Sequence, residues 1–302
     1  FMSSLNYRKE RIKKIIKYWK FRKCHDLMAS FKPSKREFEA FKNYVKIYIS
    51  KSLSIDYFEN DAKFLKSLEK GRKNRTNVTP NGGIVPKRET NLEYNLVLRE
   101  WANLVRNFTK NKPEFLSRFR TTPNIRIKFG KELEDNVKRP LNTALPHSDA
   151  WVEGPWGMNC FVPIMGDTNN NTLVYYEPKK FKDEFLTTAK TYIEMQWIMK
   201  YYKKLSIIPK AGNIYVSDYA LVHNTYRKTN CKTRISIDTT IFIGDHEPHK
   251  DRMKEYRNHI PLLGINEFVD AGQYEHEKHA EKISTFSHYT SRVLKTIKLD
   301  KN

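Results

Sequence analysis

The chain has 302 residues, enough to bury a substantial core as one large domain or as one domain with a helical extension. Hydrophobic residues make up 39% and aromatic residues 13% of the sequence, which excludes wholesale disorder. The formal charge of +22 favours anionic partners, although lysines spread over solvated helix faces produce the same excess.

Composition also bears on location and partners. The three cysteines are irregularly spaced, which matches neither a disulfide framework nor a zinc motif and favours a reducing, cytoplasmic location. No apolar run approaches the roughly 20 residues of a membrane-spanning helix, so no membrane span is expected. No recognisable nucleic-acid-binding module accompanies the basic charge, so nucleic acid is not the expected partner. Nothing in the sequence indicates the oligomeric state.

Residues 1–91 are expected to form a helical region packed on the core. Residues 7–29 place isoleucines and a tryptophan at helical spacing, which predicts an amphipathic helix. A basic amphipathic helix can also lie on an anionic membrane, but one apolar stripe ordinarily packs against a core. Residues 35–70 predict further helices with a break near 52–56. The glycines, prolines and asparagines of 71–90 predict a loop or linker, which is the best internal boundary.

Residues 92–302 are expected to form the larger unit. A helix is predicted from residue 92 to 108, and from about residue 124 the chain changes to short β-rich runs separated by turns. The runs are IRIKF, HSDAWV, MNCFVPIM, NTLVYYEP, AGNIYVSD, LVHNTY and TRISIDTTIFI. Residues 183–205 predict a helical insert between the fourth and fifth runs, and 246–302 predict C-terminal helices. Many short strands indicate a β-sandwich or barrel.

The run LPHSDAW contains His147 and Asp149, two positions apart in a segment that reads as a strand. Successive side chains of a strand point to opposite faces, so these two should project to the same side. A histidine and a carboxylate are part of the two-histidine, one-carboxylate set that binds ferrous iron and leaves the other coordination positions open. His223, 76 residues further on in an apolar extended segment, can complete the set.

An arginine that can bind a cosubstrate carboxylate follows His223 in the sequence. Arg234 lies eleven residues after His223, and Ser236 shares its face of a predicted strand. A 2-oxo acid that chelates iron through its keto group and one carboxylate leaves a far carboxylate free. That group needs a planar, permanently charged cation that donates two parallel hydrogen bonds, which describes arginine rather than lysine. Ser236 or Thr225 can add a hydroxyl donor.

The order His-x-Asp, His, Arg-x-Ser resembles the Fe(II)/2-oxoglutarate-dependent dioxygenases. The similarity covers roughly residues 124–243 and depends on four positions and their spacing. It implies an α+β fold whose core is a double-stranded β-helix, a jelly roll of the cupin type. It also implies that His147, Asp149 and His223 are the catalytic metal ligands for Fe(II), and that Arg234 binds the cosubstrate 2-oxoglutarate. An aspartate at position 149 implies hydroxylation or a related oxidation rather than halogenation.

Further residues are weaker candidates. The family commonly places a polar or basic residue on the first core strand, which makes Arg126 and Lys128 candidate contacts of the cosubstrate. Asn159 on the strand after the metal pair is another candidate. Trp151 is expected to share the face of the metal pair and to line the substrate pocket. The other candidates for substrate contact are Trp156, Tyr176 and Arg227. Arg227 also competes for the cosubstrate role, but it follows His223 too closely.

The resemblance implies that 2-oxoglutarate is converted to succinate and CO₂ while an unactivated C–H bond of a substrate is oxidised, with hydroxylation the default outcome. The excess of positive charge mildly favours a polar or anionic small molecule as substrate. A zinc-dependent hydrolase that uses the same three ligands is one alternative. A basic nucleic-acid-binding protein on an inert β-barrel is another.

Four histidines after the β-rich region are expected at the surface, namely His246, His249, His276 and His279.

Overall fold

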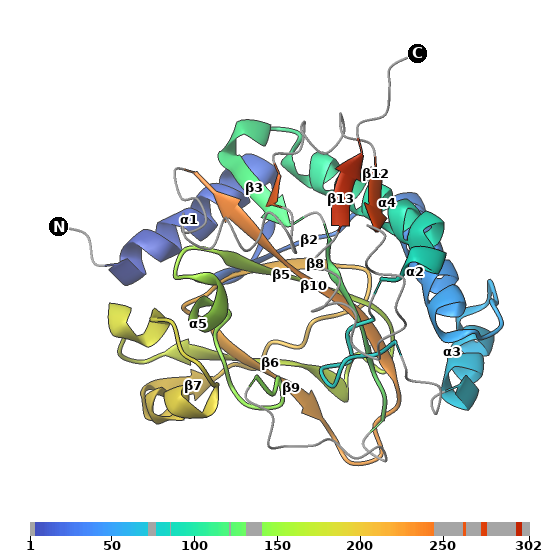
Figure 1. Ribbon diagram of the computed structural model, residues 1–302. Helices are drawn as coiled ribbons and strands as arrows, with labels where there is room; N and C mark the ends of the chain where they lie inside the picture. The colour runs from blue at the N-terminus through green and yellow to red at the C-terminus, as the bar shows by residue number, and fades with distance from the viewer. Residues whose placement is uncertain are drawn as a thin grey trace.

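The computed structural model describes residues 4–71, 77–84, 86–120, 122–130 and 141–244, with the backbone of three short strands nearer the C-terminus. Helices and antiparallel strands are both present, which confirms the mixed class (Figure 1). The larger sheet contains β1 (Arg22–His25), β2 (Met28–Phe31), β3 (Leu116–Arg120), β4 (Asn124–Lys128), β5 (Met158–Gly166), β8 (Ile214–Asp218), β10 (Arg234–Ile243) and β11 (Leu262–Leu263). The smaller sheet contains β6 (Asn171–Pro178), β7 (Tyr202–Lys204) and β9 (Val222–Arg227).

The order in the larger sheet is β1-β2-β8-β5-β10-β3-β11, and β4 also pairs with β10. The order in the smaller sheet is β7-β6-β9, and β12 (Gln273–His276) pairs only with β13 (Leu294–Ile297) among the described strands. The α-helices are α1 (Ser4–Trp19), α2 (Lys35–Leu53), α3 (Asp61–Lys70), α4 (Asn91–Thr109) and α5 (Ala150–Glu153). The 3₁₀ helices are η2 (Arg88–Thr90), η3 (Pro113–Phe115), η4 (Asp183–Leu186) and η5 (Ile193–Tyr201).

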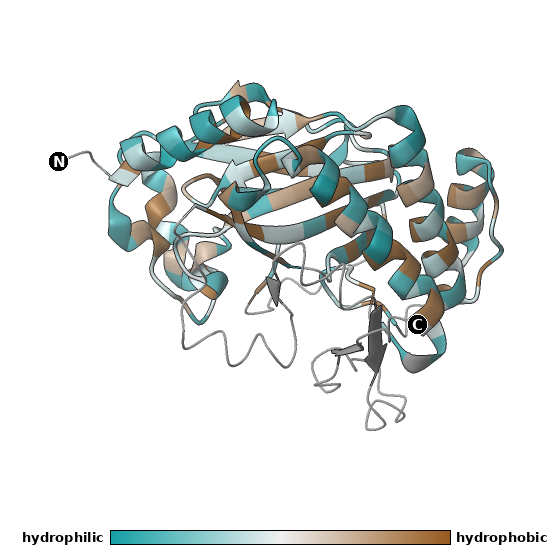
Figure 2. Ribbon diagram, turned by 90° about the horizontal axis from the view of Figure 1, so that it is seen from above, coloured by the Kyte–Doolittle hydropathy of each residue, from teal (hydrophilic) through white to brown (hydrophobic). Residues whose placement is uncertain are grey.

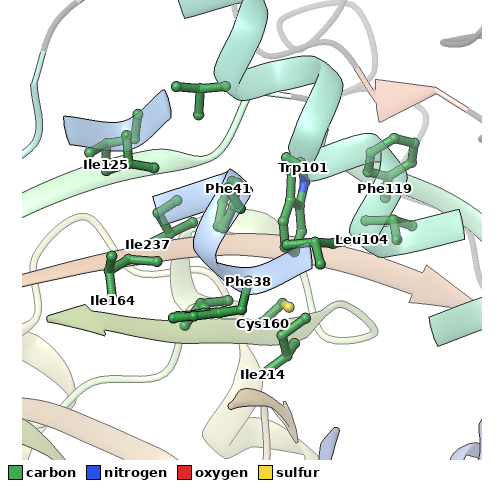
Figure 3. Packing of buried hydrophobic residues seen from close by; sticks show 14 of the residues in the cluster. Phe38, Phe41, Trp101, Leu104, Phe119, Ile125, Cys160, Ile164, Ile214 and Ile237 are labelled. Atoms are coloured by element: carbon green, nitrogen blue, oxygen red, sulfur yellow. The ribbon is translucent and has the colours of Figure 1, made fainter. Parts of the chain in front are cut away.

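The long N-terminal helices cover one face of the larger sheet and form one apolar core with it. Figure 3 shows Phe41 of α2 and Trp101 of α4 packed over Cys160 of β5 and Ile237 of β10. These helices carry hydrophobic and hydrophilic residues in alternation along their length, as amphipathic helices do (Figure 2). Because side chains of a strand alternate, the residues of β10 next to Ile237 point away from this core, toward the smaller sheet.

The predicted break in 35–70 and the predicted helix over 92–108 are confirmed by α2, α3 and α4. The helix predicted over 7–29 is wrong beyond Trp19. Lys20 adopts a left-handed conformation with φ of 60°, which ends the helix, and residues 22–31 form the β1–β2 hairpin. Since β2 pairs with β8, the N-terminal region contributes to the larger sheet as well as covering it.

The insert over 183–205 was predicted to be helical, but it forms two 3₁₀ segments and ends in β7. Its buried residues explain the tighter helix. Tyr192, Met195 and Ile198 recur every third residue, which matches the three residues per turn of a 3₁₀ helix and places all three on one side.

The helices predicted over 246–302 lie largely outside the described residues, as do His246, His249 and His279. Where the backbone is described, at 262–263, 273–276 and 294–297, it is extended, and helix is the wrong prediction there. Residues 273–276 and 294–297 pair antiparallel, so inter-strand hydrogen bonds replace helical ones. None of the described helices has the length and apolar character of a bilayer span.

The core between α4 and the larger sheet can be tested at Trp101, which is fully buried against Phe41. We expect Trp101→Ala to lower the free energy of unfolding by about 3–5 kcal/mol, because it leaves a cavity among packed side chains. Urea denaturation measures the change. Leu92→Ala is the matched control, since Leu92 lies on the same helix but is 70% exposed, and it should change stability by no more than about 0.5 kcal/mol. Equal effects of the two substitutions would contradict this view of the core.

Candidate metal centre

Backbone pairing brings together two histidines that are far apart in the sequence. The His147 N–H donates to the carbonyl of His223 at 2.8 Å, and the His223 N–H donates to the carbonyl of His147 at 2.9 Å. Residues directly opposite each other in an antiparallel pair present their side chains on the same face. The two imidazole rings accordingly lie with their centroids 4.4 Å apart.

Asp149 joins the histidines from a turn rather than from a strand. Its Oδ1 lies 3.9 Å from His147 Nε2 and 4.0 Å from His223 Nε2. The strand predicted through HSDAWV stops after His147, because Ser148 and Asp149 start the single helical turn α5. Serine and aspartate favour helix starts, and here the Ser148 hydroxyl accepts from the N–H of Ala150.

Neighbouring groups orient these three side chains. The His147 Nδ1–H donates to the carbonyl of Leu145 at 2.8 Å, so Nε2 faces the cavity. The amide of Asn159 donates to Asp149 Oδ2 at 2.8 Å, which leaves Oδ1 toward the histidines. One ligand atom from each of the three residues lies within 4.8 Å of the others, which suits a shared metal ion.

Burial sets the protonation of the site. It lowers the pKa of His147 to about 3, helped by the nearby His223. It also lowers the pKa of His223 to about 4. Both imidazoles are therefore neutral at physiological pH, with a nitrogen lone pair available for a metal. Burial raises the pKa of Asp149, against the opposing effects of His147 and Asn159.

A buried cation lines the same cavity. Arg234 on β10 is 1% exposed, and its Nη1 donates to the carbonyl of Asn171 at 3.1 Å. Burial lowers the pKa of Arg234 to about 10, which still leaves it charged at neutral pH. Within the described residues, Arg234 Nε and the hydroxyl of Ser236 have no hydrogen-bond partner. Phe161 and Thr225 line the cavity beside them, and buried unsatisfied donors of this kind call for an explanation.

Arg126 also lines the cavity, but another protein group holds it. Its Nε and Nη2 both donate to the carboxylate of Asp238, the second at 2.9 Å. Burial would raise the pKa of Asp238, but the charge of Arg126 lowers it below its usual value. Asp238 is not among the site residues predicted from sequence. Asp238 lies four residues after Arg234 on β10. Since every second side chain of a strand points to the same face, the face that carries Arg234 and Ser236 also carries Asp238.

The predicted linker contributes a wall to the same region. The Ile127 N–H donates to the carbonyl of Gly82, and the Ile84 N–H donates to the carbonyl of Ile125, each at 2.8 Å. Residues 82–84 therefore pair with the edge of β4. The adjacent carbonyl of Asn81 accepts from Arg126 Nη1 at 3.3 Å. No local sequence signal marks this pairing, because it depends on long-range contact.

The four residues predicted to contact substrate lie outside the cavity lining. Because Trp151 belongs to α5 rather than to a strand, it does not share the face of His147; its indole N–H donates to the carbonyl of Phe185 in the core. Trp156 packs against the guanidinium of Arg8. Tyr176 is half-buried on β6, next to the buried Tyr175. Arg227 donates to backbone carbonyls, those of Phe129 and Gly130.

An aromatic residue of the insert takes the place expected for Trp151. Tyr192 stacks on the ring of His147, with centroids 4.3 Å apart and an interplanar angle of 12°, and it lines the cavity. Gln196 of η5 donates to the carbonyl of Pro146 at 2.8 Å, which ties the insert to the segment before His147. The sequence shows many aromatic residues in the insert, and nothing local distinguishes Tyr192 among them.

No protein-family model and no curated protein matches the chain. Among solved structures, it is similar to the non-heme alpha-ketoglutarate-dependent carbocyclase SnoK from nogalamycin biosynthesis, with 11% identity over 83% of this chain and 96% of that chain (TM-score 0.46). It is similar to a novel N-substituted L-amino acid dioxygenase from Burkholderia ambifaria AMMD, with 13% identity over 72% and 82% (TM-score 0.35). It is also similar to AviO1 from Streptomyces viridochromogenes Tue57, with 15% identity over 79% and 97% (TM-score 0.41). At these values the side chains of the site must carry any assignment of function.

The lowered pKa values of the two histidines predict how the stability of the metal-free protein depends on pH. Between pH 6.5, the ordinary histidine pKa, and about 4, the unfolded chain binds protons that the folded chain does not. The stabilisation is therefore complete above pH 6.5 and is lost as the pH falls through this window. We expect thermal denaturation to show a falling Tm from pH 7 to pH 4.5, and a shallower fall in His147→Gln. His25→Gln, on β1, is the control, and equal slopes in wild type and His147→Gln would refute the explanation.

Proposed function

We propose that this chain is an Fe(II)- and 2-oxoglutarate-dependent oxygenase that oxidises an unactivated C–H bond of a polar small molecule, on a double-stranded β-helix core. The observation that carries the proposal is the meeting in one cavity of two neutral histidines, a carboxylate and a buried arginine. The arginine, Arg234, has a free Nε donor within the described residues.

His147, Asp149 and His223 fit a ferrous ion. Two imidazole nitrogens and one carboxylate oxygen on one side of an ion leave its remaining positions open for other ligands. The carbonyl of Leu145 and the amide of Asn159 hold the ligand atoms in place, as outer partners do in metal sites. With dioxygen as the oxidant, bound iron and 2-oxoglutarate would supply the oxidising chemistry. The cosubstrate would take one oxygen atom and become succinate and CO₂, and the other oxygen atom would hydroxylate the substrate, or leave as water where the substrate is otherwise oxidised.

The far end of the cavity fits the distal carboxylate of 2-oxoglutarate. A carboxylate accepts hydrogen bonds, and Arg234 Nε and the Ser236 hydroxyl are two buried donors that lack an acceptor in the described part of the chain. Phe161 and Leu173 give this end apolar walls suited to methylene carbons, and Thr225 adds a hydroxyl. The cosubstrate would thus satisfy groups that the protein itself leaves unsatisfied.

The remaining cavity wall is assigned to the substrate. Its lining residues are Tyr192, Thr143 and the ion pair of Arg126 with Asp238. Their task is to orient the reacting carbon and to exclude water, which is the main contribution of a protein to cofactor chemistry. Because this wall carries hydroxyl, phenol and charged groups, it supports a substrate with polar groups.

Anaerobic addition of Fe(II) and 2-oxoglutarate tests the proposal. We expect wild type to develop the weak visible charge-transfer absorption of the chelate, and Asp149→Ala to lose it because one metal ligand is gone. Arg234→Ala should weaken 2-oxoglutarate binding by about 30-fold or more, since truncating one partner of a buried charge pair costs about 2–5 kcal/mol. Titration of the absorption band with 2-oxoglutarate gives the affinity.

Arg227→Ala is the matched control, because Arg227 lies on β9 near the site but outside the cavity lining. It should leave both the band and its titration unchanged. If Arg227→Ala weakened the band and Arg234→Ala did not, the assignment of the cosubstrate arginine would be wrong. If wild type gave no band but bound Zn²⁺ tightly through the same residues, the hydrolase would replace the oxygenase.

A further inference from the structure

The position of the Asp149 side chain is not fixed by strand pairing. Backbone hydrogen bonds fix His147 and His223 opposite each other, but Asp149 lies past the end of that pairing, in the turn that starts α5. A residue in a turn owes its side-chain position to tertiary contacts. The contacts that hold both ends of the segment from residue 148 to 153 converge on one residue, Tyr219, at its backbone carbonyl and at its phenol.

Tyr219 is 1% exposed and lies four residues before His223. Its backbone carbonyl accepts from the hydroxyl of Ser148 at 2.7 Å. Its phenol donates to the carboxylate of Glu153 at the end of α5 and lies 3.0 Å from the hydroxyl of Thr240. Asp149 therefore lies between two residues that are both hydrogen-bonded to Tyr219.

The ring of Tyr219 packs tightly in one position. A Cβ atom at Gly157 would lie 2.6 Å from the Tyr219 ring, so the glycine is needed for the ring to pack there. Ala150 and Leu186 pack around the same ring. This packing fixes the direction of the phenol, and with it the position of the Glu153 carboxylate.

The Glu153 carboxylate links Tyr219 to the wall beside Asp149. It accepts hydrogen bonds from both Tyr219 and Thr240. Thr240 on β10 lies directly opposite Asn159 on β5, and the amide of Asn159 donates to Asp149. The contacts that start at the Tyr219 phenol therefore lead through Glu153, Thr240 and Asn159 to the carboxylate of Asp149.

The turn that carries Tyr219 is itself anchored. Arg8 and Arg11 of α1 each donate to the carboxylate of the preceding Asp218 at 2.9 Å. The same two arginines donate to the carbonyls of Pro155 and Trp156, just after α5. Helix α1 therefore holds together the segment after Asp149 and the segment before His223.

We propose that Tyr219 is a positioning residue of the metal centre: through Ser148 and through Glu153 it holds Asp149 at ligand distance from the two histidines. The proposal rests on the proposed metal site. Tyr219 does not contact a ligand atom, so its effect is on the affinity and geometry of the site rather than on the chemistry of bound groups.

Binding of Co²⁺ to the metal-free protein tests this without any measurement of activity. We expect Tyr219→Phe to weaken Co²⁺ binding by up to about 10-fold and to alter its visible ligand-field spectrum, because Tyr219 lies one contact beyond the outer partners of the ligands, whose own loss typically costs about 10- to 100-fold in metal affinity. Tyr202→Phe is the matched control. Tyr202 is also buried, but its hydroxyl has no partner among the described residues, so its removal should change nothing.

Two further variants separate positioning from general destabilisation. Thr240→Val removes the second donor to Glu153 while keeping the side-chain volume, and it should weaken Co²⁺ binding in the same direction even if Tyr219→Phe fails to fold. Ile237→Val lowers core stability on the opposite face of β10 and should leave the Co²⁺ affinity unchanged.

The outcomes distinguish the two proposals. Wild-type Co²⁺ affinity in Tyr219→Phe and Thr240→Val, or an equal loss in Tyr202→Phe or Ile237→Val, would overturn the role of Tyr219 and leave the metal site standing. No Co²⁺ binding by wild type, or undiminished binding by His147→Ala, would refute the metal site itself, and the role of Tyr219 with it.

Discussion

The reciprocal pair of backbone hydrogen bonds between His147 and His223 is the constraint on which the site depends. The pairing continues along β9, where the Thr225 N–H donates to the carbonyl of Thr143 at 2.8 Å and the Asn224 amide donates to the carbonyl of Ala144. The segment before Asp149 is therefore attached to the smaller sheet, while the segment after it packs toward the larger one through Glu153 and Thr240. Asp149 lies where the chain passes from one sheet to the other, which is why its carboxylate can meet both histidines between them.

Strand β10 divides the molecule into two environments. Ile235, Ile237 and Ile241 face the apolar core beneath the helices, whereas Arg234, Ser236 and Asp238 face the cavity. A well-packed face holds the strand rigidly, and that rigidity fixes the polar groups on the other side. Buried polar groups usually find partners within the protein, and Arg234 Nε and the Ser236 hydroxyl are two exceptions that line the cavity. Stability and site are thus built on opposite faces of the same strand.

Much of this could be read from sequence because it follows from local periodicity. The helices over 35–70 and 92–108 have apolar stripes, the strands from residue 124 onward alternate, and the spacing of Arg234 and Ser236 places them on one face. Features that depend on long-range contact were not accessible. The β1–β2 hairpin exists because β8 offers an edge, and Asn81 reaches the site because residues 82–84 pair with β4. For Asp149 the prediction of a strand was wrong, although its carboxylate still lies near His147 and His223. The turn before α5, rather than strand alternation, places it there.

The ion pair of Arg126 with Asp238 has an electrostatic consequence for the cavity as a whole. Among the described lining residues, two acidic side chains, Asp149 and Asp238, oppose two basic ones, Arg126 and Arg234, so the formal charges cancel. The surplus of +22 carried by the chain therefore belongs to other parts of the sequence. Such a surplus acts at long range and is screened over about 10 Å at 0.1 M salt. This surplus can raise the association rate of anions in general. Selectivity among those anions depends on the placement of individual hydrogen-bond donors and acceptors inside a cavity with no net formal charge.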